Sequence, residues 1–268
     1  MRGTTVGPVR VSTTQWESMI GMLERAQVAF DRVKQRVPAD LRVRARTALF
    51  RAPRLGAASV VLDSRTRGNR IDSHTEIVLD GYHRSANSFA GTQFALANPD
   101  VRVSTHIHSP GAIITACRHQ IPAIVLIRDP YDAVPSLMQL MVGTRPSSAI
   151  RMWTRYYSVV EPYLDRVVVA DFGEVIEDFG GVVRRCNVKW GTAFVEPHPS
   201  VDFENSVRAK IAESWQGHPG VPLPSSRRRS SESIRADLSP PERAALEAAH
   251  DLYESIKARY VAPADGRG

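Results

Sequence analysis

Short apolar runs alternate with longer segments of helical periodicity through the middle of the chain. The runs typical of buried strands occupy Glu76–Asp80, Val101–Thr105, Ala123–Ile127 and Arg166–Ala170. The run AIVLI at Ala123–Ile127 is continuously apolar, as expected of a strand that helices cover on both faces. Because strands and helices alternate, the pattern predicts an α/β fold with a mostly parallel central sheet.

Helices are expected between and around these strands. The predicted helical segments are Ser12–Val37, Ser85–Leu96, Ser109–Arg118, Tyr131–Met141, Ser148–Leu164, Phe172–Cys186, Phe203–Trp215 and Ser239–Tyr260. A further short strand is expected at Ala57–Leu62, with loops at Ser64–Ser73 and Gly217–Ser233. We expect the 268 residues to form one domain. Its parts are an N-terminal helical segment (1–72), a central core (76–191) and a C-terminal loop with helices (192–268).

Composition places the chain among ordinary globular proteins with a basic surplus. The hydrophobic fraction is 43% and the charged fraction 24%, which is typical of soluble domains. The formal net charge of +7 is consistent with solvated arginines, with an anionic ligand or with nucleic acid. No nucleic-acid-binding motif or basic-aromatic repeat is present in the sequence, so we expect no nucleic-acid partner.

Cysteine usage and hydropathy bear on location. Cys117 and Cys186 form no CxxC pair, so we expect two reduced core residues and a cytoplasmic protein. No apolar segment suits a secretory signal or a membrane span. The segment Leu41–Leu55 combines arginines with Leu49 and Phe50, which leaves peripheral membrane contact open. No pattern indicates an oligomeric state.

The first polar motif follows the strand at Glu76–Asp80, and it runs from Gly81 to Ser88. A turn from a strand into a helix aims free backbone N–H groups, and the helix dipole, at one point. Arg84 is suited to gripping phosphate or sulfate oxygens, and Ser85, Asn87 and Ser88 to donating further hydrogen bonds. The motif lacks the glycine-lysine pair of a Walker A loop. An ordinary β–α turn with a serine cap is the alternative interpretation.

The second motif follows the strand at Ala123–Ile127, and its sequence is RDPYDAVPS. Arg128 leaves the end of this strand, and Ser136 lies about two turns into the next predicted helix. In a parallel sheet the C-terminal ends of strands face one ligand-binding edge. Arg128 and Ser136 are therefore candidates to meet around a phosphate near the first motif. The alternative is an arginine at a strand end and a serine on a helix face.

The third motif is Thr105-His106-Ile107-His108. In an extended segment His106 and His108 share a face. Either imidazole is suited to taking a proton from an attacking hydroxyl, because it titrates near neutral pH. A purely structural role for both histidines is the alternative.

In this order, the three motifs resemble the sulfotransferases that use 3′-phosphoadenosine 5′-phosphosulfate (PAPS). Family members carry a loop like Y-P-[KR]-S-G-T-T-W, which here is Tyr82–Phe89, and many have a T-H pair, here Thr105-His106. The family pattern R-x-P-x-D-x-x-x-S is matched at every fixed position by Arg128, Pro130, Asp132 and Ser136. The resemblance covers about residues 76–191. It departs from the family where Ala86 replaces a glycine, His83 a proline and Ser104 a lysine.

The resemblance implies a three-layer α/β/α fold of the P-loop kinase type, with residues 76–191 as the nucleotide-binding core. It implies transfer of a sulfuryl group from PAPS to a hydroxyl or amine of a small-molecule, lipid or carbohydrate acceptor, without a metal. Its base would be His106, with His108 as second candidate, and Arg84 would stabilise charge on the leaving oxygen. The implied nucleotide-binding residues are Arg84, Ser85, Ala86, Asn87, Ser88, Phe89, Arg128, Ser136, Phe172, Arg227, Arg228 and Arg229.

Within this set, Arg128 and Ser136 would hold the 3′-phosphate and Phe172 would lie near the adenine. Arg227, Arg228 and Arg229 would also reach the 3′-phosphate, or they form a solvated cluster. Two other functions stay open. One is a small-molecule kinase, which needs magnesium ligands and normally a loop lysine, and the other is a non-catalytic nucleotide-binding protein.

Overall fold

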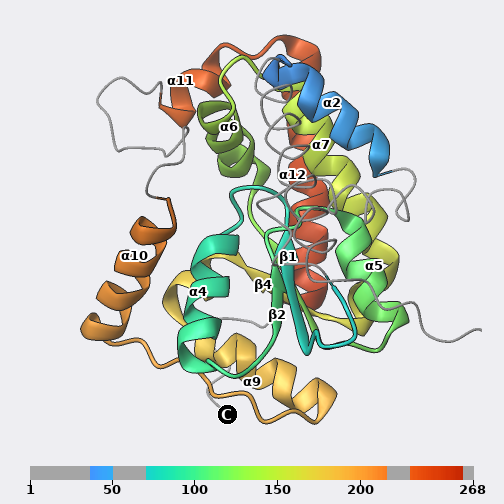
Figure 1. Cartoon of the computed structure of the whole chain (residues 1–268). Coiled ribbons are helices and arrows are strands. Elements are labelled where there is room, and N and C mark those ends of the chain that lie inside the picture. The colour runs from blue at the N-terminus through green and yellow to red at the C-terminus, as the bar shows by residue number, and fades with distance from the viewer. Residues whose placement is uncertain (1–36, 51–70, 216–229, 262–268) are drawn as a thin grey trace, which may run out of the picture.

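The chain folds around a four-stranded, wholly parallel sheet (Figure 1). The computed structural model describes residues 37–50, 71–215 and 230–261. The strands are β1 (Ile77–Gly81), β2 (Val103–Thr105), β3 (Ala123–Ile127) and β4 (Val168–Asp171), in the order β2-β1-β3-β4. The predicted α/β class and parallel sheet are confirmed, because each of the four central apolar runs forms a strand.

Helices account for most of the remaining described residues. They are α2 (Ala39–Leu49), α4 (Asn87–Ala97), α5 (Pro110–Arg118), α6 (Pro130–Leu140), α7 (Pro146–Val160), α8 (Phe172–Glu177), α9 (Phe179–Trp190), α10 (Val201–Trp215), α11 (Ser231–Ala236) and α12 (Pro240–Tyr260), with a 3-10 turn η3 (Glu161–Arg166). The predicted strand Ala57–Leu62 and nearly all of the predicted helical segment Ser12–Val37 lie outside the described residues.

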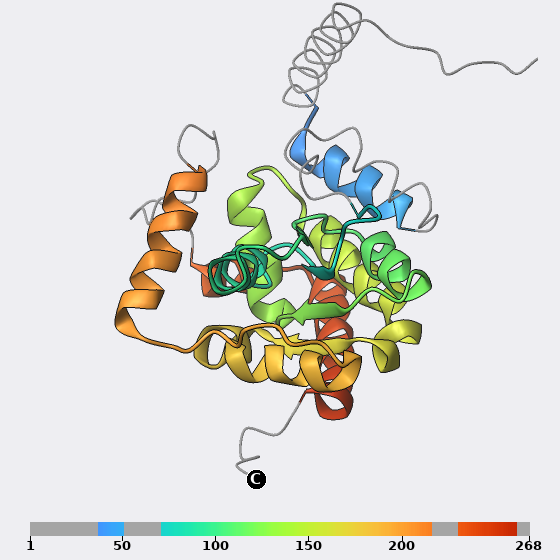
Figure 2. The same cartoon turned by 60° about the horizontal axis from the view of Figure 1, so that its bottom comes forward.

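The sheet lies between two groups of helices, as the turned view in Figure 2 shows. Alternate strand residues, such as Val78 and Val125, pack against one core with α5, α6, α7 and α12. Their neighbours, such as Leu79 and Leu126, pack against a second core with α4, α8 and α9. Both faces of β1, β3 and β4 therefore meet apolar side chains, which explains why these strands are largely apolar without alternation. The shorter edge strand β2 has the sequence VST and is only partly buried.

The strand order reverses direction next to β1. From β1 the chain passes through α4 to β2 on one side, and it then returns through α5 to β3 on the other side. Helix α4 consequently covers one face of the sheet and α5 the opposite face. Such a reversal opens a crevice beyond the C-terminal ends of the two central strands, where ligands of open α/β sheets bind. The residues that follow β1 and β3 lie at this switch point.

Three predicted boundaries differ from the structure. The single helix expected over Phe172–Cys186 is two helices, because the Asp178 side chain accepts the Gly181 N–H and begins α9 anew. The helix expected over Ser148–Leu164 is α-helical only to Val160 and continues as η3, with Pro162 in its first turn. The end of the predicted loop Gly217–Ser233 belongs to α11, which Ser230 caps through the Ser233 N–H.

Helix α6 runs without interruption through Pro135. Proline has no N–H, so the carbonyl of Tyr131, four residues earlier, lacks its helical donor. Arg235 of α11 supplies the missing donor, since its Nη1 lies 3.0 Å from the Tyr131 carbonyl oxygen. Helix α11 thus completes α6, the helix that carries Ser136.

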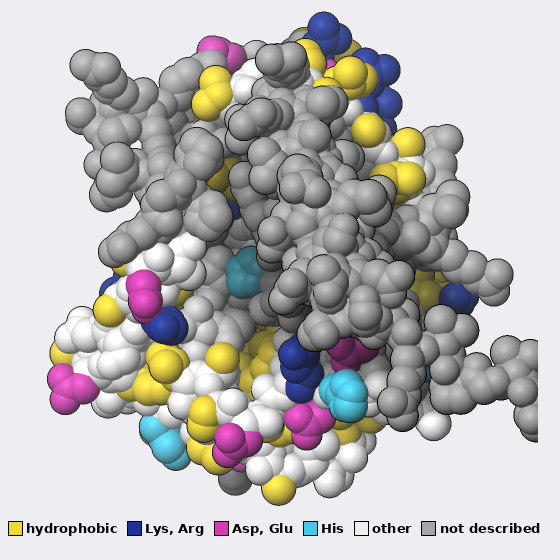
Figure 3. Space-filling view, in the orientation of Figure 1, with side chains coloured by type: hydrophobic (Ala, Val, Ile, Leu, Met, Phe, Trp, Pro, Cys, Tyr) yellow, Lys and Arg dark blue, Asp and Glu magenta, His cyan; other side chains and the backbone are white. Residues whose placement is uncertain are grey.

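Helix α2 packs part of its apolar surface inward. Val43 and Phe50 are buried, and the Phe50 ring meets the Tyr156 ring of α7 edge-on at 5.9 Å between centroids. Basic side chains gather on the outer surface over α2 in Figure 3. Val43 and Phe50 of the predicted amphipathic segment therefore belong to the core, whereas Leu41 is 52% exposed. Among the described helices, none is both long enough and apolar enough to cross a bilayer.

Candidate functional site at the switch point

Gly81 ends β1 and pairs with Leu126 of β3. A Cβ at this position would overlap the carbonyl oxygen of Leu126, so the site requires glycine. The chain then turns through Arg84 and Ala86, whose φ angles are 69° and 64°, and enters α4. The two left-handed residues flank Ser85, and alternation of this kind turns successive N–H groups toward one concave side of the backbone.

Helix α4 begins without a side-chain cap. Its N-cap residue is Ala86, which has no side chain that could accept from the first-turn N–H groups. The groups left without helical partners belong to Asn87, Ser88 and Phe89. Together with the helix dipole, they form a positively polarised surface suited to an anion.

Two polar side chains of this turn point into the protein. Tyr157 donates to the Leu126 carbonyl at 2.7 Å, so the 3.4 Å contact between Ser85 Oγ and the Tyr157 hydroxyl has Ser85 as donor. Ser85 is fully buried. The Asn87 side-chain amide donates to the Tyr82 carbonyl at 2.9 Å. The side chains of Ser85 and Asn87 therefore shape the turn from beneath, whereas Arg84 and Ser88 are only partly buried.

The second motif meets the first through two arginines. Arg84 Nε donates to Ser136 Oγ at 2.9 Å, and Arg128 Nη1 donates to the Arg84 carbonyl at 3.0 Å. The Arg128 guanidinium also stacks on the Phe172 ring, 4.1 Å from its centroid. Arg84, Arg128, Ser136 and Phe172, drawn from three connections of the sheet, therefore lie together as the sequence predicted.

Arg128 is held from several sides and still has a donor to spare. Its carbonyl accepts from the Trp153 indole N–H at 3.1 Å. Its Nε is buried, without a hydrogen-bond partner. Burial lowers the pKa of Arg128 below its ordinary value, and the nearby carboxylates Asp132, Asp129 and Asp171 oppose that shift. A buried guanidinium with an unmatched N–H is a suitable partner for an anionic oxygen.

The third motif lies against both ends of the β1–α4 turn. His108 Nδ1 lies 3.0 Å from the Gly81 carbonyl oxygen, and His106 Nε2 lies 2.9 Å from Ser88 Oγ. A carbonyl oxygen only accepts, so His108 carries its proton on Nδ1 and leaves Nε2 as the basic nitrogen. Both histidines have left-handed backbones, with φ of 60° at His106 and 51° at His108.

Asp80 anchors this histidine connection from below. The carboxylate is fully buried, and it accepts the backbone N–H of His108 at 2.8 Å, the N–H of Ser109 at 3.1 Å and the Tyr156 hydroxyl at 3.2 Å. Burial raises the pKa of Asp80 to about 7, and the three donors act in the opposite direction. Asp80 therefore joins the end of β1 to the start of α5.

His83 is a site residue that no sequence motif identified as functional. Its ring stacks on His108 with 4.0 Å between centroids, and His106 meets His108 edge-on at 5.8 Å. Burial lowers the pKa of His106 to about 4, and burial with neighbouring positive groups lowers the pKa of His83 and His108 well below the ordinary value. The cluster is thus neutral at physiological pH, as proton acceptors must be.

Helix α12 contributes two further residues that the motifs did not indicate. Tyr253 donates to Asp171 at 2.7 Å, and His250 Nδ1 lies 3.3 Å from Asp129. Asp171 is the last residue of β4 and caps α8, which carries Phe172, whereas Asp129 lies two residues after β3 and caps α6, which carries Ser136. The signal in the sequence is only that each acid lies near the C-terminal end of a strand, because their partners lie 82 and 121 residues away.

Phe89 and the run Arg227–Arg229 are the remaining predicted parts of the site. Phe89 lies in the first turn of α4, and the guanidinium of Arg208 of α10 lies 6.0 Å from the centroid of its ring. Arg227, Arg228 and Arg229 lie outside the described residues. In the described ranges, no group of three or more His, Cys, Asp or Glu side chains is arranged to hold a metal ion.

The fold and the site together define a parallel α/β protein with a basic, histidine-rich site at the switch point of its sheet. Comparison with known proteins adds no family to this description. No family model matches the chain, and no curated protein matches its sequence. The chemistry of the site therefore rests on the geometry described above.

Proposed function

We propose that this protein is a PAPS-dependent sulfotransferase acting on a hydroxyl group. The observation that carries the proposal is the 2.9 Å hydrogen bond from Arg84 to Ser136, which joins two motifs 52 residues apart in the chain. A ligand with anionic groups at two places could engage the residues of both motifs at once. PAPS has two such groups, a 5′-phosphosulfate and a 3′-phosphate.

The described residues suit such a ligand. The uncapped start of α4 and Arg84 would receive the 5′-phosphosulfate, with Ser88 as a hydroxyl donor. The part-buried Arg128 guanidinium and Ser136 would receive the 3′-phosphate. Because the side chains of Ser85 and Asn87 point inward, we assign them to the support of the turn rather than to direct contact. Phe172 is fixed on Arg128 and presents the remaining aromatic surface for the adenine.

The transfer follows from positioning and electrostatics. The acceptor oxygen attacks the sulfur of PAPS in line with the bridging S–O bond, and a new S–O bond forms as that bridging bond breaks. The bonding electron pair moves to the 5′-phosphate, which leaves as adenosine 3′,5′-bisphosphate. Arg84 and the α4 N–H groups stabilise the charge that develops on the leaving oxygen.

The acceptor proton moves to an imidazole. The Gly81 carbonyl fixes the tautomer of His108, which leaves Nε2 basic, whereas Nε2 of His106 is engaged with Ser88. We therefore assign the proton to His108, and we assign His106 to the orientation of Ser88. The geometry therefore favours His108 over His106 as the base, whereas the resemblance gives His106 as the first candidate.

Thermal unfolding with added nucleotide tests the proposal. We expect adenosine 3′,5′-bisphosphate to raise the melting temperature and ADP with magnesium to leave it unchanged, because ligands stabilise the state that binds them. Arg128→Ala should weaken the stabilisation. Arg151→Ala, an exposed arginine of α7, is the matched control and should keep it.

Two results would count against the proposal. Stabilisation by ADP with magnesium in preference to the bisphosphate would indicate a kinase. If neither nucleotide stabilised the protein, both the sulfotransferase and the kinase would be excluded. If the bisphosphate binds but Arg128→Ala binds equally well, the assignment of the 3′-phosphate to Arg128 is wrong.

A further inference from the structure

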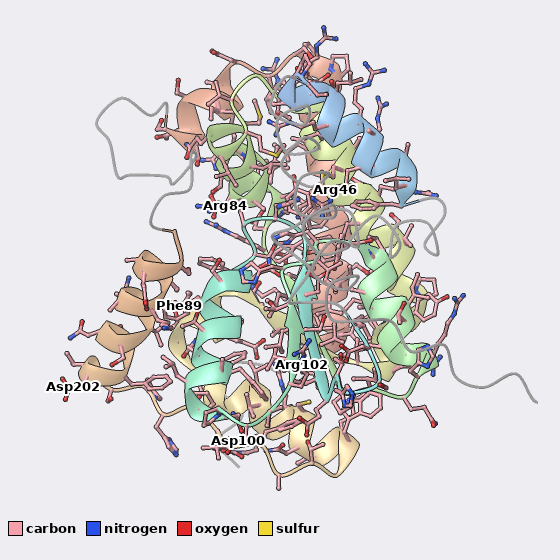
Figure 4. The ribbon with its side chains drawn as sticks, viewed as in Figure 1. Arg46, Arg84, Phe89, Asp100, Arg102 and Asp202 are labelled. Carbon is pink, nitrogen blue, oxygen red and sulfur yellow. The ribbon has the colours of Figure 1, made fainter. Side chains whose placement is uncertain are left out.

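Arg46 links helix α2 to the connection between β2 and α5. Its Nη2 donates to the carbonyl oxygen of Ile107 at 2.6 Å, and the side chain of Ile107 is buried. Arg46 belongs to the basic segment that the sequence left open for membrane contact. In the structure its guanidinium instead reaches the site, and Figure 4 shows Arg46 and Arg84 near the C-terminal ends of the strands.

The connection from His106 to His108 needs such a contact. Both histidines have positive φ angles, which residues other than glycine keep only where the surroundings fix them. Asp80 holds the N–H of His108 on one side of the Ile107 peptide. Arg46 holds the carbonyl of Ile107 itself, between the two strained residues.

We propose that Arg46 is a positioning residue of the site. By holding the Ile107 carbonyl, it keeps the His106 ring beside Ser88 and the His108 ring beside Gly81, at opposite ends of the β1–α4 turn. The chemical meaning of this inference rests on the proposed function, in which these histidines face the acceptor. The geometric role stands independently of it, and it makes α2 part of the site.

The charge of Arg46 also reaches the imidazoles. Burial is the main cause that lowers the pKa of His83 and His108, and Arg46 lowers both further. Burial alone lowers the pKa of His106. The titratable and charged groups of the described residues that face His108 are His83, His106, Arg46, Arg84 and Asp80.

Histidine-ring NMR of the full chain at a series of pH values tests the inference. In Arg46→Met we expect His83 and His108 to titrate at higher pH than in the wild type, because a neighbouring positive charge is gone. The titration of His106 should keep its midpoint, while its ring signals move because the Ile107 peptide is released. A residue that only filled space would leave the two midpoints unchanged.

Arg46→Lys separates the charge from the geometry. Lysine retains the charge and cannot reproduce the planar guanidinium, so the midpoints of His83 and His108 should stay near the wild type while the ring signals of His106 and His108 move. Arg44→Met, at an exposed position of the same helix, is the control and should match the wild type throughout. Unchanged ring signals in Arg46→Met would overturn the inference. If Arg46→Met does not fold, unchanged ring signals in Arg46→Lys would overturn the inference instead.

The outcome is distinguishable from failure of the proposed function. The hydrogen bond from Arg46 to Ile107 lies in the histidine connection, so Arg46→Met should retain most of the stabilisation by adenosine 3′,5′-bisphosphate. A wild type that does not respond to the bisphosphate contradicts the sulfotransferase proposal, and the histidine titration is still decisive for Arg46. A normal response to the bisphosphate with unchanged histidine signals contradicts the Arg46 inference alone.

Discussion

At the scale of single residues, backbone strain is concentrated at the switch point. Of the five described residues other than glycine with positive φ, four lie there: Arg84, Ala86, His106 and His108. Each such residue costs about 1–2 kcal/mol relative to an ordinary conformation. Strain of this size persists where surrounding contacts fix it, and it is found most often at functional sites.

Substitution of Ala86 by glycine tests this backbone strain directly. Its side chain makes no cap for α4, and its φ is 64°, a conformation that glycine adopts freely. We expect Ala86→Gly to raise the free energy of unfolding by about 1 kcal/mol, as measured by urea denaturation. Ala95→Gly, at an exposed helical position of α4, should lower it by about 1 kcal/mol instead. Equal effects of the two substitutions would show that Ala86 is unstrained.

At the scale of elements, α6 depends on α11. The Tyr131 carbonyl has lost its helical donor to Pro135, and Arg235 replaces that donor at 3.0 Å. We expect Arg235→Ala to lower the free energy of unfolding by about 1 kcal/mol, since it leaves this carbonyl unmatched. Chemical denaturation of the variant and the wild type measures the difference.

A double-mutant cycle isolates this contact. Pro135→Ala restores an N–H that can reach the Tyr131 carbonyl, so Arg235→Ala should cost less in that background. The Asp132 carboxylate also lies 3.6 Å from Arg235. It is more than half exposed, so loss of this ion pair contributes little to the destabilisation by Arg235→Ala. If Arg235→Ala lowered the free energy of unfolding equally in the wild type and in Pro135→Ala, Arg235 would not be replacing the missing N–H of Pro135.

The elements also show which features the sequence could predict. The strands β1, β3 and β4 were predictable because a strand covered on both faces is largely apolar. The edge strand β2, with the sequence VST, was predictable from its place between two helical segments. The gap between α8 and α9 was not, because one side-chain cap at Asp178 decides it within an otherwise helical pattern. In the site, the nearness of Arg84, Arg128 and Ser136 was predictable because their motifs follow neighbouring parallel strands, and Phe172 was indicated by the resemblance. His83, Arg46 and Tyr253 were not predictable, because their roles arise from contacts between segments far apart in the chain.

At the scale of the whole molecule, the site makes stability depend on pH. Burial holds the pKa of His106 at about 4, below its ordinary value of 6.5, so the unfolded chain binds more protons between these values. Stability from this group is complete above pH 6.5, and it is lost as the pH falls toward 4. His83 and His108 act in the same direction. Asp80 acts in the opposite direction, because its pKa is raised to about 7.

Three histidines reduce stability as the pH falls, and of the four groups only Asp80 increases it. We therefore expect the free energy of unfolding to fall between pH 7 and pH 5. His106→Gln should reduce that fall, because the variant no longer has this imidazole to protonate on unfolding. Urea denaturation at the two pH values gives the comparison. His119→Gln, at an exposed position, is the control and should fall as steeply as the wild type. A fall as steep in His106→Gln as in the control would refute this linkage.

The four left-handed residues have a consequence for how this fold changes over evolutionary time. Glycine at any of these positions would relieve strain, but at Arg84, His106 or His108 it would also remove the guanidinium or the imidazole. Selection for stability alone would therefore drift these positions toward glycine or asparagine. Retention of arginine and histidine at these positions in a relative would therefore indicate selection for their chemistry, whereas glycine at all four would preserve the backbone without those side chains.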